Sequence, residues 1–328
     1  MLSFITLCLA AFAFAQVKPI EEDTTPIKVD TTLVTVPVMV SDENGRSVKA
    51  LDKRDFSIVS NGIKREIDFF ADIEEPVVVA IVLDTSGSVT SILDELKVAA
   101  KSMLSSLRPV DRAIVATFDH NARILQAATS DTTQLERAID SAEVTYDPDI
   151  PFRVGSFNDA FEIIFSEHFL RVEGRKAVIV FTDSGEFAET EELTNLVASG
   201  DVPVYPIFYP SGALYEGLMF VKQKKLAKEV GRKRNLPLDL ALKVPGVQYL
   251  NSLATLSGGR LHSSGESEFA SALTNIMAEI RKQYVIGFHV DGDTDASSRD
   301  ISVTVNRPGL TVRTKQNIKL EQPAPIRK

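Results

Sequence analysis

A short run of oxygen-bearing side chains follows the first strongly apolar segment of the sequence. Asp84, Ser86 and Ser88 alternate in the string Asp-Thr-Ser-Gly-Ser, directly after the apolar run from Val77 to Leu83. That run is typical of a strand buried on both faces, so the string lies at the carboxyl end of a strand, where open parallel sheets bind their ligands. The pattern predicts a binding site. The alternative is that the serines only cap the next helix and the aspartate is a solvated strand end.

A second carboxylate follows a second apolar run of the same kind. Asp183 stands in the string Phe-Thr-Asp-Ser-Gly, after the strand pattern from Ala177 to Phe181. Because the carboxyl ends of parallel strands meet at one edge, Asp84 and Asp183 are expected at neighbouring strand ends.

Catalysis is disfavoured by the residues that are missing. A phosphatase of the haloacid dehalogenase type would use Asp84 as its nucleophile and needs a second aspartate two residues later, where this chain has Ser86. The sequence also lacks a nucleophile elbow, a phosphate-binding loop and a dinucleotide-binding glycine pattern. The four histidines are scattered without the spacing of metal ligands. We therefore expect that the chain is not an enzyme.

Strand and helix patterns alternate between residues 75 and 282. The strand patterns span 77–83, 113–118, 177–181 and 202–208, and helix patterns lie between and after them. Ser91 and Asp94 have the spacing of a capping box at the start of the first helix. Such alternation predicts a Rossmann-like, doubly wound α/β fold with a mostly parallel sheet.

Residues 214–247 form an insertion in this pattern with an unusual charge. Between positions 222 and 234 of this insertion, one glutamate, Glu229, stands among seven basic residues: Lys222, Lys224, Lys225, Lys228, Arg232, Lys233 and Arg234. The segment has two interpretations, a solvated helix with a loop or a basic docking surface for an acidic partner.

Two segments of alternating apolar residues flank the α/β region. Residues 31–72 contain the hairpin signals Asn44-Gly45 and Asn61-Gly62, and residues 284–319 contain Asp291-Gly292 and Pro308-Gly309. Either segment alone is too short for an independent core. We expect the two segments to fold together as one small β domain.

The N-terminal segment of the sequence predicts export. Residues 1–15 are apolar or small and end in Ala13-Phe14-Ala15, which is typical of a signal peptide, and residues 16–30 read as a flexible leader before the folded part. Residues 320–328 are a tail. No membrane-spanning segment is expected after signal removal, and a mature chain without cysteine favours a secreted or periplasmic protein of a bacterial envelope. The net charge of -9 disfavours nucleic acid as a partner.

Residues 75–282 resemble a von Willebrand factor type A domain with a metal-ion-dependent adhesion site. The resemblance is closest at Val79 to Val89 and at Lys176 to Glu186, and the flanking β segments resemble bacterial exported proteins related to this domain. It implies that Asp84, Ser86, Ser88 and Asp183 bind one ion, Mg²⁺ or alternatively Mn²⁺ or Ca²⁺. The family's third loop supplies a threonine where this chain has Gly155, and Ser156 beside it is the expected substitute.

The resemblance also implies how such a site would bind a protein. Neutral hydroxyl ligands leave most of the charge of the ion uncompensated, and an open coordination position can accept a glutamate or aspartate of a partner. The expected function is therefore an exported adhesion module. The alternatives are a metal-free envelope scaffold and, less favoured, a metal-dependent phosphohydrolase.

Overall fold

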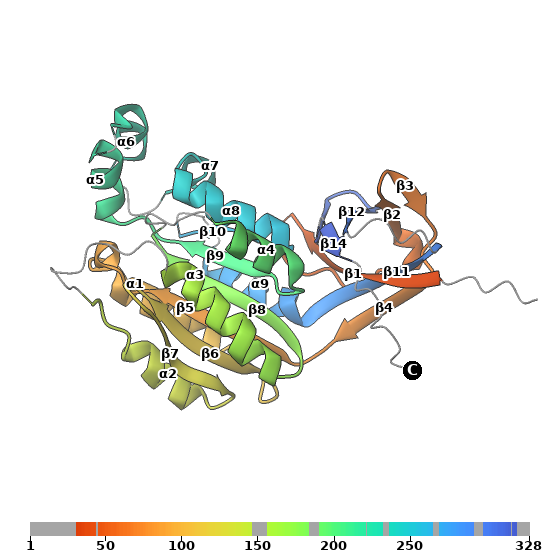
Figure 1. Cartoon of the computed structure of the whole chain (residues 1–328), viewed down its shortest axis with the longest axis horizontal. Helices are drawn as coiled ribbons and strands as arrows, with labels where there is room; N and C mark the ends of the chain where they lie inside the picture. The colour runs from red at the N-terminus through yellow and green to blue at the C-terminus, as the bar shows by residue number, and fades with distance from the viewer. Residues whose placement is uncertain are drawn as a thin grey trace, which may run out of the picture.

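The computed structural model describes residues 31–43, 45–145, 156–183, 190–220, 222–231, 236–264, 269–291, 298–315 and 317–319. These residues form an α/β domain and a smaller β domain (Figure 1). The predicted signal peptide, leader and tail lie outside the described residues. Among the described residues, no helix has the length and apolar character needed to cross a membrane.

The α/β domain is built on a six-stranded sheet with the order β10-β9-β8-β5-β6-β7. Neighbouring strands run parallel except for β7, which is antiparallel to β6. The strands are β5 (Val77–Asp84), β6 (Arg112–Phe118), β7 (Ala122–Thr129), β8 (Arg175–Thr182), β9 (Val204–Phe208) and β10 (His262–Ser263). The fold class predicted from the sequence is confirmed, although the edge strand β7 was missed.

Helices cover both faces of this sheet. One core contains side chains of α1 (Leu93–Leu104), α2 (Thr132–Asp140) and α9 (Phe269–Arg281). The other contains side chains of α3 (Ser156–Ile163), α4 (Glu191–Ser199) and α8 (Pro245–Ser257). Side chains of β5 alternate between the two cores, with Val82 in one and Leu83 in the other. The apolar run of β5 is continuous because neither face of this strand meets solvent.

The described residues of the basic insertion include three short helices: α5 (Gly212–Phe220), α6 (Lys224–Val230) and α7 (Leu238–Ala241). Helices α5 and α6 contact each other. They stand out from the body of the α/β domain at the upper left of Figure 1.

The β domain consists of two four-stranded sheets with the orders β13-β1-β11-β4 and β14-β12-β2-β3. Its N-terminal strands are β1 (Thr31–Asp42), β2 (Phe56–Ser60), β3 (Ile63–Arg65) and β4 (Phe69–Glu74). Its C-terminal strands are β11 (Lys282–Asp291), β12 (Ser298–Val305), β13 (Leu310–Thr314) and β14 (Asn317–Lys319). Strand β1 lies between β11 and β13, and β2 pairs with β12. The prediction that the two segments fold together is confirmed, and side chains of both form one core.

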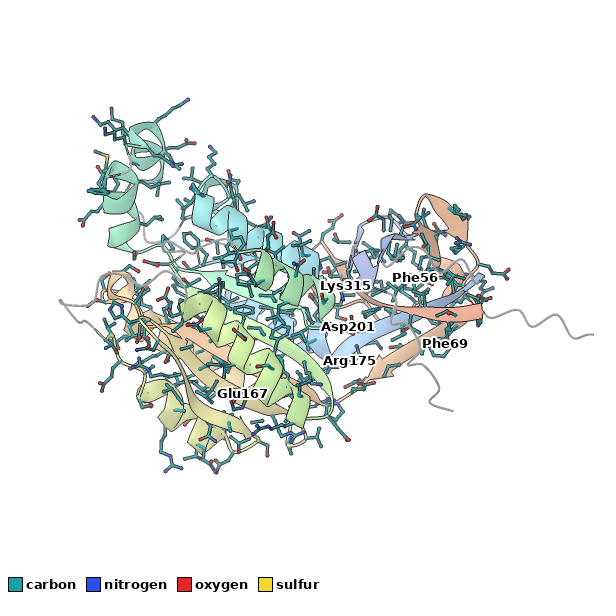
Figure 2. The ribbon with its side chains drawn as sticks, in the orientation of Figure 1. Phe56, Phe69, Glu167, Arg175, Asp201 and Lys315 are labelled. Carbon is teal, nitrogen blue, oxygen red and sulfur yellow. The ribbon has the colours of Figure 1, made fainter. Side chains whose placement is uncertain are left out.

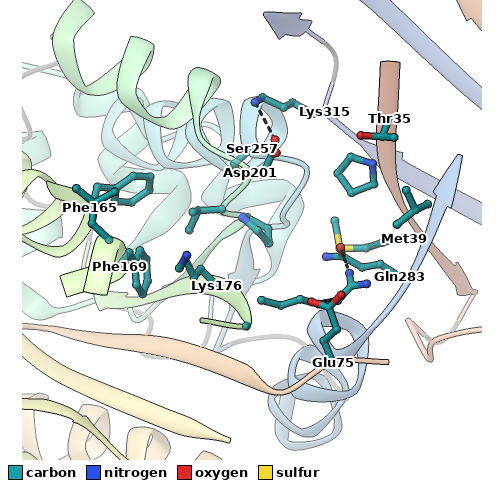
Figure 3. Close-up of a pocket in the computed structure, with 17 residues that line it drawn as sticks. Thr35, Met39, Glu75, Phe165, Phe169, Lys176, Asp201, Ser257, Gln283 and Lys315 are labelled. Atoms are coloured by element: carbon teal, nitrogen blue, oxygen red, sulfur yellow. Dashed lines mark hydrogen bonds and ion pairs between the residues drawn. The ribbon is translucent and has the colours of Figure 1, made fainter. Parts of the chain in front are cut away.

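The two domains meet at the amino end of the central strands. Figure 2 shows Arg175, Asp201 and Lys315 where they meet. The ammonium group of Lys315 donates to the backbone oxygen of Ser199 at 2.8 Å, and Arg175 donates to the side chain of Gln283. A cavity of about 480 Å³ lies between the domains, with Phe165 and Phe169 on one side and β1 on the other (Figure 3). The β domain therefore leaves the opposite, carboxyl edge of the sheet uncovered.

A buried carboxylate fastens the amino edge. Asp111 is fully buried and accepts hydrogen bonds from the backbone N–H of Val77 at 3.1 Å and from Arg281 Nη2 at 2.7 Å. Arg108 also donates to it, from its backbone at 2.9 Å. Burial raises the pKa of Asp111, but these hydrogen bonds outweigh burial and hold that pKa below its ordinary value. One carboxylate thus joins the start of β5 to the end of α9.

Replacing this carboxylate should cost far more than replacing one at the surface. Asp111→Asn leaves Arg281, which is 13% exposed, without its counter-charge, and should lower the free energy of unfolding by about 3 kcal/mol. Asp140→Asn is the matched control because it removes the exposed ion pair of Lys101, and it should cost less than about 1 kcal/mol. Urea denaturation at neutral pH measures both. Equal losses in the two variants would contradict a structural role for Asp111.

Candidate metal centre

The candidate site lies where the chain changes direction across the sheet. The strand that follows β5 in the chain, β6, lies on one side of it, and the later strand β8 lies on the other. Asp84 is the last residue of β5, and Asp183 follows the last residue of β8. Ligands of open α/β sheets bind at such a switch point. Both aspartates are buried, with exposed fractions of 1% and 2%.

Hydroxyl groups connect the two carboxylates. The hydroxyls of Ser86 and Ser88 are 2.9 Å apart, and that of Ser88 donates to Asp183 Oδ1 at 3.1 Å. Asp84 accepts from the backbone N–H of Ser86 at 2.9 Å and from the hydroxyl of Thr182 at 2.6 Å. The structure thus gathers four of the predicted residues, Asp84, Ser86, Ser88 and Asp183, into one network.

The serines do not cap the helix that follows. Residues Gly87–Val89 form a single 3₁₀ turn, and Ser86, which precedes it, makes no side-chain capping bond. Helix α1 begins only at Leu93, after Ile92, and has no side-chain cap. The predicted capping box of Ser91 and Asp94 is therefore wrong. The 3₁₀ turn separates the serines from the helix, and the hydroxyl of Ser88 is bonded to Asp183 while that of Ser86 is bonded to Ser88.

Two buried carboxylates at one edge repel each other. Burial, together with the charge of Asp183, raises the pKa of Asp84 to about 7, and the hydrogen bonds from Thr182 and Ser86 offset this only partly. An ionised pair at this edge is therefore unfavourable without a compensating charge.

Ser156 lies near this network but is not hydrogen-bonded to the predicted ligands. It is buried at the first residue of α3, and its hydroxyl donates to the backbone oxygen of Asp119. The carboxylate of Asp119 accepts from the hydroxyl of Thr85 at 3.0 Å. Two hydrogen bonds through Asp119 thus connect Ser156 to Thr85, the residue that follows Asp84 in the chain. Gly155, whose position the resemblance assigns to a threonine, lies outside the described residues. A role for Ser156 as a ligand stays a prediction.

Ser211 belongs to the site and was not predicted. It is buried just before α5, donates to Asp183 Oδ2 and accepts from the backbone N–H of Leu214 at 3.3 Å. The sequence signal was weak, because a lone serine after Tyr-Pro matches no spacing rule. Strand β9 ends beside β8, and this pairing brings Ser211 to Asp183.

The donor set suits a small hard cation. Both carboxylates and the serine hydroxyls offer only oxygen, which Mg²⁺ and Ca²⁺ prefer. Because burial and the charge of Asp183 raise the pKa of Asp84, a bound cation would favour the ionised form of this carboxylate. In the part of the chain that the structure describes, no three Asp, Glu, His or Cys side chains cluster as a metal site, so an ion here would depend on the hydroxyls.

The sequence profile of the von Willebrand factor type A domain matches residues 79–186. The matched residues begin in β5 and end just after Asp183, so they include most of the network described above. The resemblance predicted from the sequence is thereby confirmed for this part of the chain. No curated protein matches the sequence.

The solved structures that match this chain share little sequence with it. A conserved hypothetical protein, BatB, from Bacteroides thetaiotaomicron is 19% identical, with 62% of this chain and 97% of that chain covered and a TM-score of 0.44. A von Willebrand factor type A protein from Catenulispora acidiphila is 12% identical, covering 81% and 73%, with a TM-score of 0.44. Proximal thread matrix protein 1 from the mussel byssus, with a zinc-occupied adhesion-site motif, is 14% identical, covering 66% and 49%, with a TM-score of 0.43.

The raised pKa predicts an unusual pH dependence of the metal-free chain. Between pH 4 and 7 the folded chain holds a proton on Asp84 that the unfolded chain has lost, so stability falls as pH rises through this window. Asp84→Asn should remove that loss and stabilise the chain at pH 8 by about 2 to 4 kcal/mol, with little change at pH 4. Urea denaturation in EDTA at both pH values measures it.

An exposed aspartate provides the control for this measurement. Asp239→Asn, on the surface of α7, should leave the pH dependence of the wild-type chain unchanged. A loss of stability between pH 4 and 8 that is the same in Asp84→Asn and in wild type would contradict the buried carboxylate as its source.

Proposed function

We propose that the von Willebrand factor type A domain of this chain binds one divalent cation at the edge formed by Asp84 and Asp183, and through it a carboxylate of a protein partner. The observation that carries the proposal is the convergence of two buried carboxylates and two serine hydroxyls at the switch point. The domain match over residues 79–186 supports the same reading.

Each residue would have a distinct part in holding the ion. Ser86 and Ser88 supply neutral oxygens, and Asp84 and Asp183 supply the negative charge. Thr182 and Ser211 donate to these two carboxylates and so fix their orientation. A bound Mg²⁺ supplies an incompletely neutralised charge and a coordination position open to a carboxylate of the partner.

We also propose that the chain acts by binding and not by catalysis. A serine nucleophile needs a general base within hydrogen-bond reach. In the described structure, the hydroxyl of Ser88 donates to Asp183 and is paired with that of Ser86, and the proposal assigns this carboxylate to the ion and not to a serine nucleophile. An exported location in a bacterial envelope, proposed from residues 1–15 and from the absence of cysteine in the mature chain, suits a binding protein of this kind.

Metal binding is the first test. Calorimetric titration with Mg²⁺ and Mn²⁺ should show one ion per chain, and Asp84→Ala should weaken it more than about 100-fold while the domain stays folded by circular dichroism. The double variant Ser102→Ala, Ser105→Ala, at the far end of α1, is the control and should bind as wild type does. Unchanged affinity in Asp84→Ala would refute the site.

Ser156→Ala belongs to the same titration. Weaker binding in this variant would support Ser156 as a ligand, directly or through water. Wild-type affinity would assign its hydroxyl only to the backbone of Asp119. If wild type itself binds no ion, the metal-free scaffold remains.

Partner binding is the second test. Pull-downs with the purified chain from an envelope extract should recover a protein in Mg²⁺ and lose it in EDTA. The double variant Ser86→Ala, Ser88→Ala should lose the same protein, because it lacks both neutral ligands, whereas the α1 double variant should keep it. A protein retained equally in EDTA and in the Ser86, Ser88 variant would show that the metal edge is not the binding face.

A further inference from the structure

Helices α5 and α6 form a hairpin that begins at the candidate metal edge. Ser211, one residue before α5, bonds both Asp183 and the backbone of Leu214, so the hairpin is tied at its base to a predicted ligand. Helix α5 also contacts the Gly87–Val89 turn that carries Ser88. From this base the two helices extend away from the body of the domain (Figure 1).

The far end of α5 exposes large apolar side chains. Phe220 is 87% exposed and Met219 is 38% exposed, whereas Leu218 beside them is buried. Two backbone hydrogen bonds follow the end of α5: the N–H of Gln223 donates to Leu218 O at 2.9 Å and that of Lys222 to Met219 O at 3.3 Å. Phe220 is therefore held at the end of a defined helix while it faces solvent.

Exposed lysines surround this apolar end. Four lysines here are exposed: Lys222, Lys224, Lys225 and Lys228. The buried side chains of α6 are Ala227 and Val230. The hairpin carries two glutamates, Glu216 and Glu229, and Glu229 is paired with Lys243. In a chain of net charge -9, this is a local excess of positive charge.

The turn residue itself is strained. Lys222 has a φ of 63°, in the left-handed region where helix ends usually have glycine. A lysine there costs backbone energy that a glycine would avoid. Its charge adds to the cationic surface at the turn.

We propose that the α5–α6 hairpin is a second contact surface for the same protein partner, with Phe220 as an apolar anchor and the lysines against an acidic surface. The proposal rests on the proposed function in taking the partner to be one that offers a carboxylate to the metal edge. A partner with an acidic surface satisfies both contacts, because cation and lysines attract the same charge.

The dimensions fit a single interface. The rise of 1.5 Å per residue places Phe220 about 12 Å along the helix from Gly212. A standard interface buries about 800 Å² on each partner, which corresponds to a patch of roughly 16 Å radius. One partner can therefore cover the metal edge and Phe220 together.

A protein fits this surface better than a lipid bilayer does. Stable attachment of a helix to a membrane needs a continuous apolar face, but Leu218 of α5 is buried in the protein, and among the described residues of α5 only Met219 and Phe220 are large, apolar and exposed. A single exposed aromatic side chain can instead act as an anchor that a protein partner encloses in a pocket.

The test uses a defined acidic probe. A fluorescein-labelled peptide built from glutamate and leucine is titrated with the purified chain in Mg²⁺, and binding is followed by anisotropy. Phe220→Ser, and separately the double variant Lys224→Glu, Lys225→Glu, should each weaken binding by roughly tenfold. The charge variant should also flatten the salt dependence of binding.

Matched controls change the same chemistry elsewhere. Leu170→Ser alters another strongly exposed apolar residue, and the double variant Lys49→Glu, Lys64→Glu makes the same change of net charge on the β domain. Both should bind the peptide as wild type does. Wild-type binding by the hairpin variants, equal losses in the controls, or no saturable binding by the wild-type chain would each overturn the proposal.

Two further arms separate the possible failures. If EDTA abolishes peptide binding but the hairpin variants bind normally, the hairpin proposal fails and the metal site stands. If the hairpin variants lose binding and EDTA has no effect, the hairpin stands and the metal site fails. Vesicles of phosphatidylcholine and phosphatidylglycerol should not bind; vesicle binding that depends on Phe220 would replace the protein partner by a membrane.

Discussion

The repulsion between two buried carboxylates is the constraint on which the functional edge depends. Asp84 and Asp183 are brought together because β5 and β8 are neighbours, and a fold that buries such a pair must supply either a proton or a positive charge. The surrounding hydroxyls of Thr182, Ser88 and Ser211 reduce that cost without removing it. An edge of this kind is less stable than an apolar one, which is the usual property of a site kept for binding.

The contacts that join the two domains lie at the opposite end of the sheet from this edge. The β domain, the cavity between the domains and the Asp111 network all lie at the amino end of the strands. A strand of eight residues such as β5 spans about 26 Å, so the two ends of the sheet are well separated. Contacts at the carboxyl edge can therefore change without disturbing the union of the domains.

The sequence predicted the α/β domain well because its strands are buried on both faces, as the uninterrupted run ending at Leu83 shows. It predicted the joining of the terminal β segments from their small apolar surfaces. It missed β7, whose residues are only partly buried and lack a clear alternation. The false capping box at Ser91 arose because local spacing cannot show that a 3₁₀ turn delays the helix until Leu93. The sequence did not predict Ser211 as a site residue, because its position beside Asp183 results from the pairing of β9 with β8.

The strand order of the β domain has a consequence for how the chain acquires its structure. Strand β1 is the first described element, yet both of its neighbours, β11 and β13, follow the whole α/β domain. During synthesis β1 lacks these partner strands until the whole α/β domain has emerged, and closing so long a loop makes this pairing slow. The α/β domain, whose contacts are more local, can form first. Until the C-terminal strands arrive, β1 is an unpaired edge open to other chains, so the β domain is where a shortened or stalled chain would aggregate.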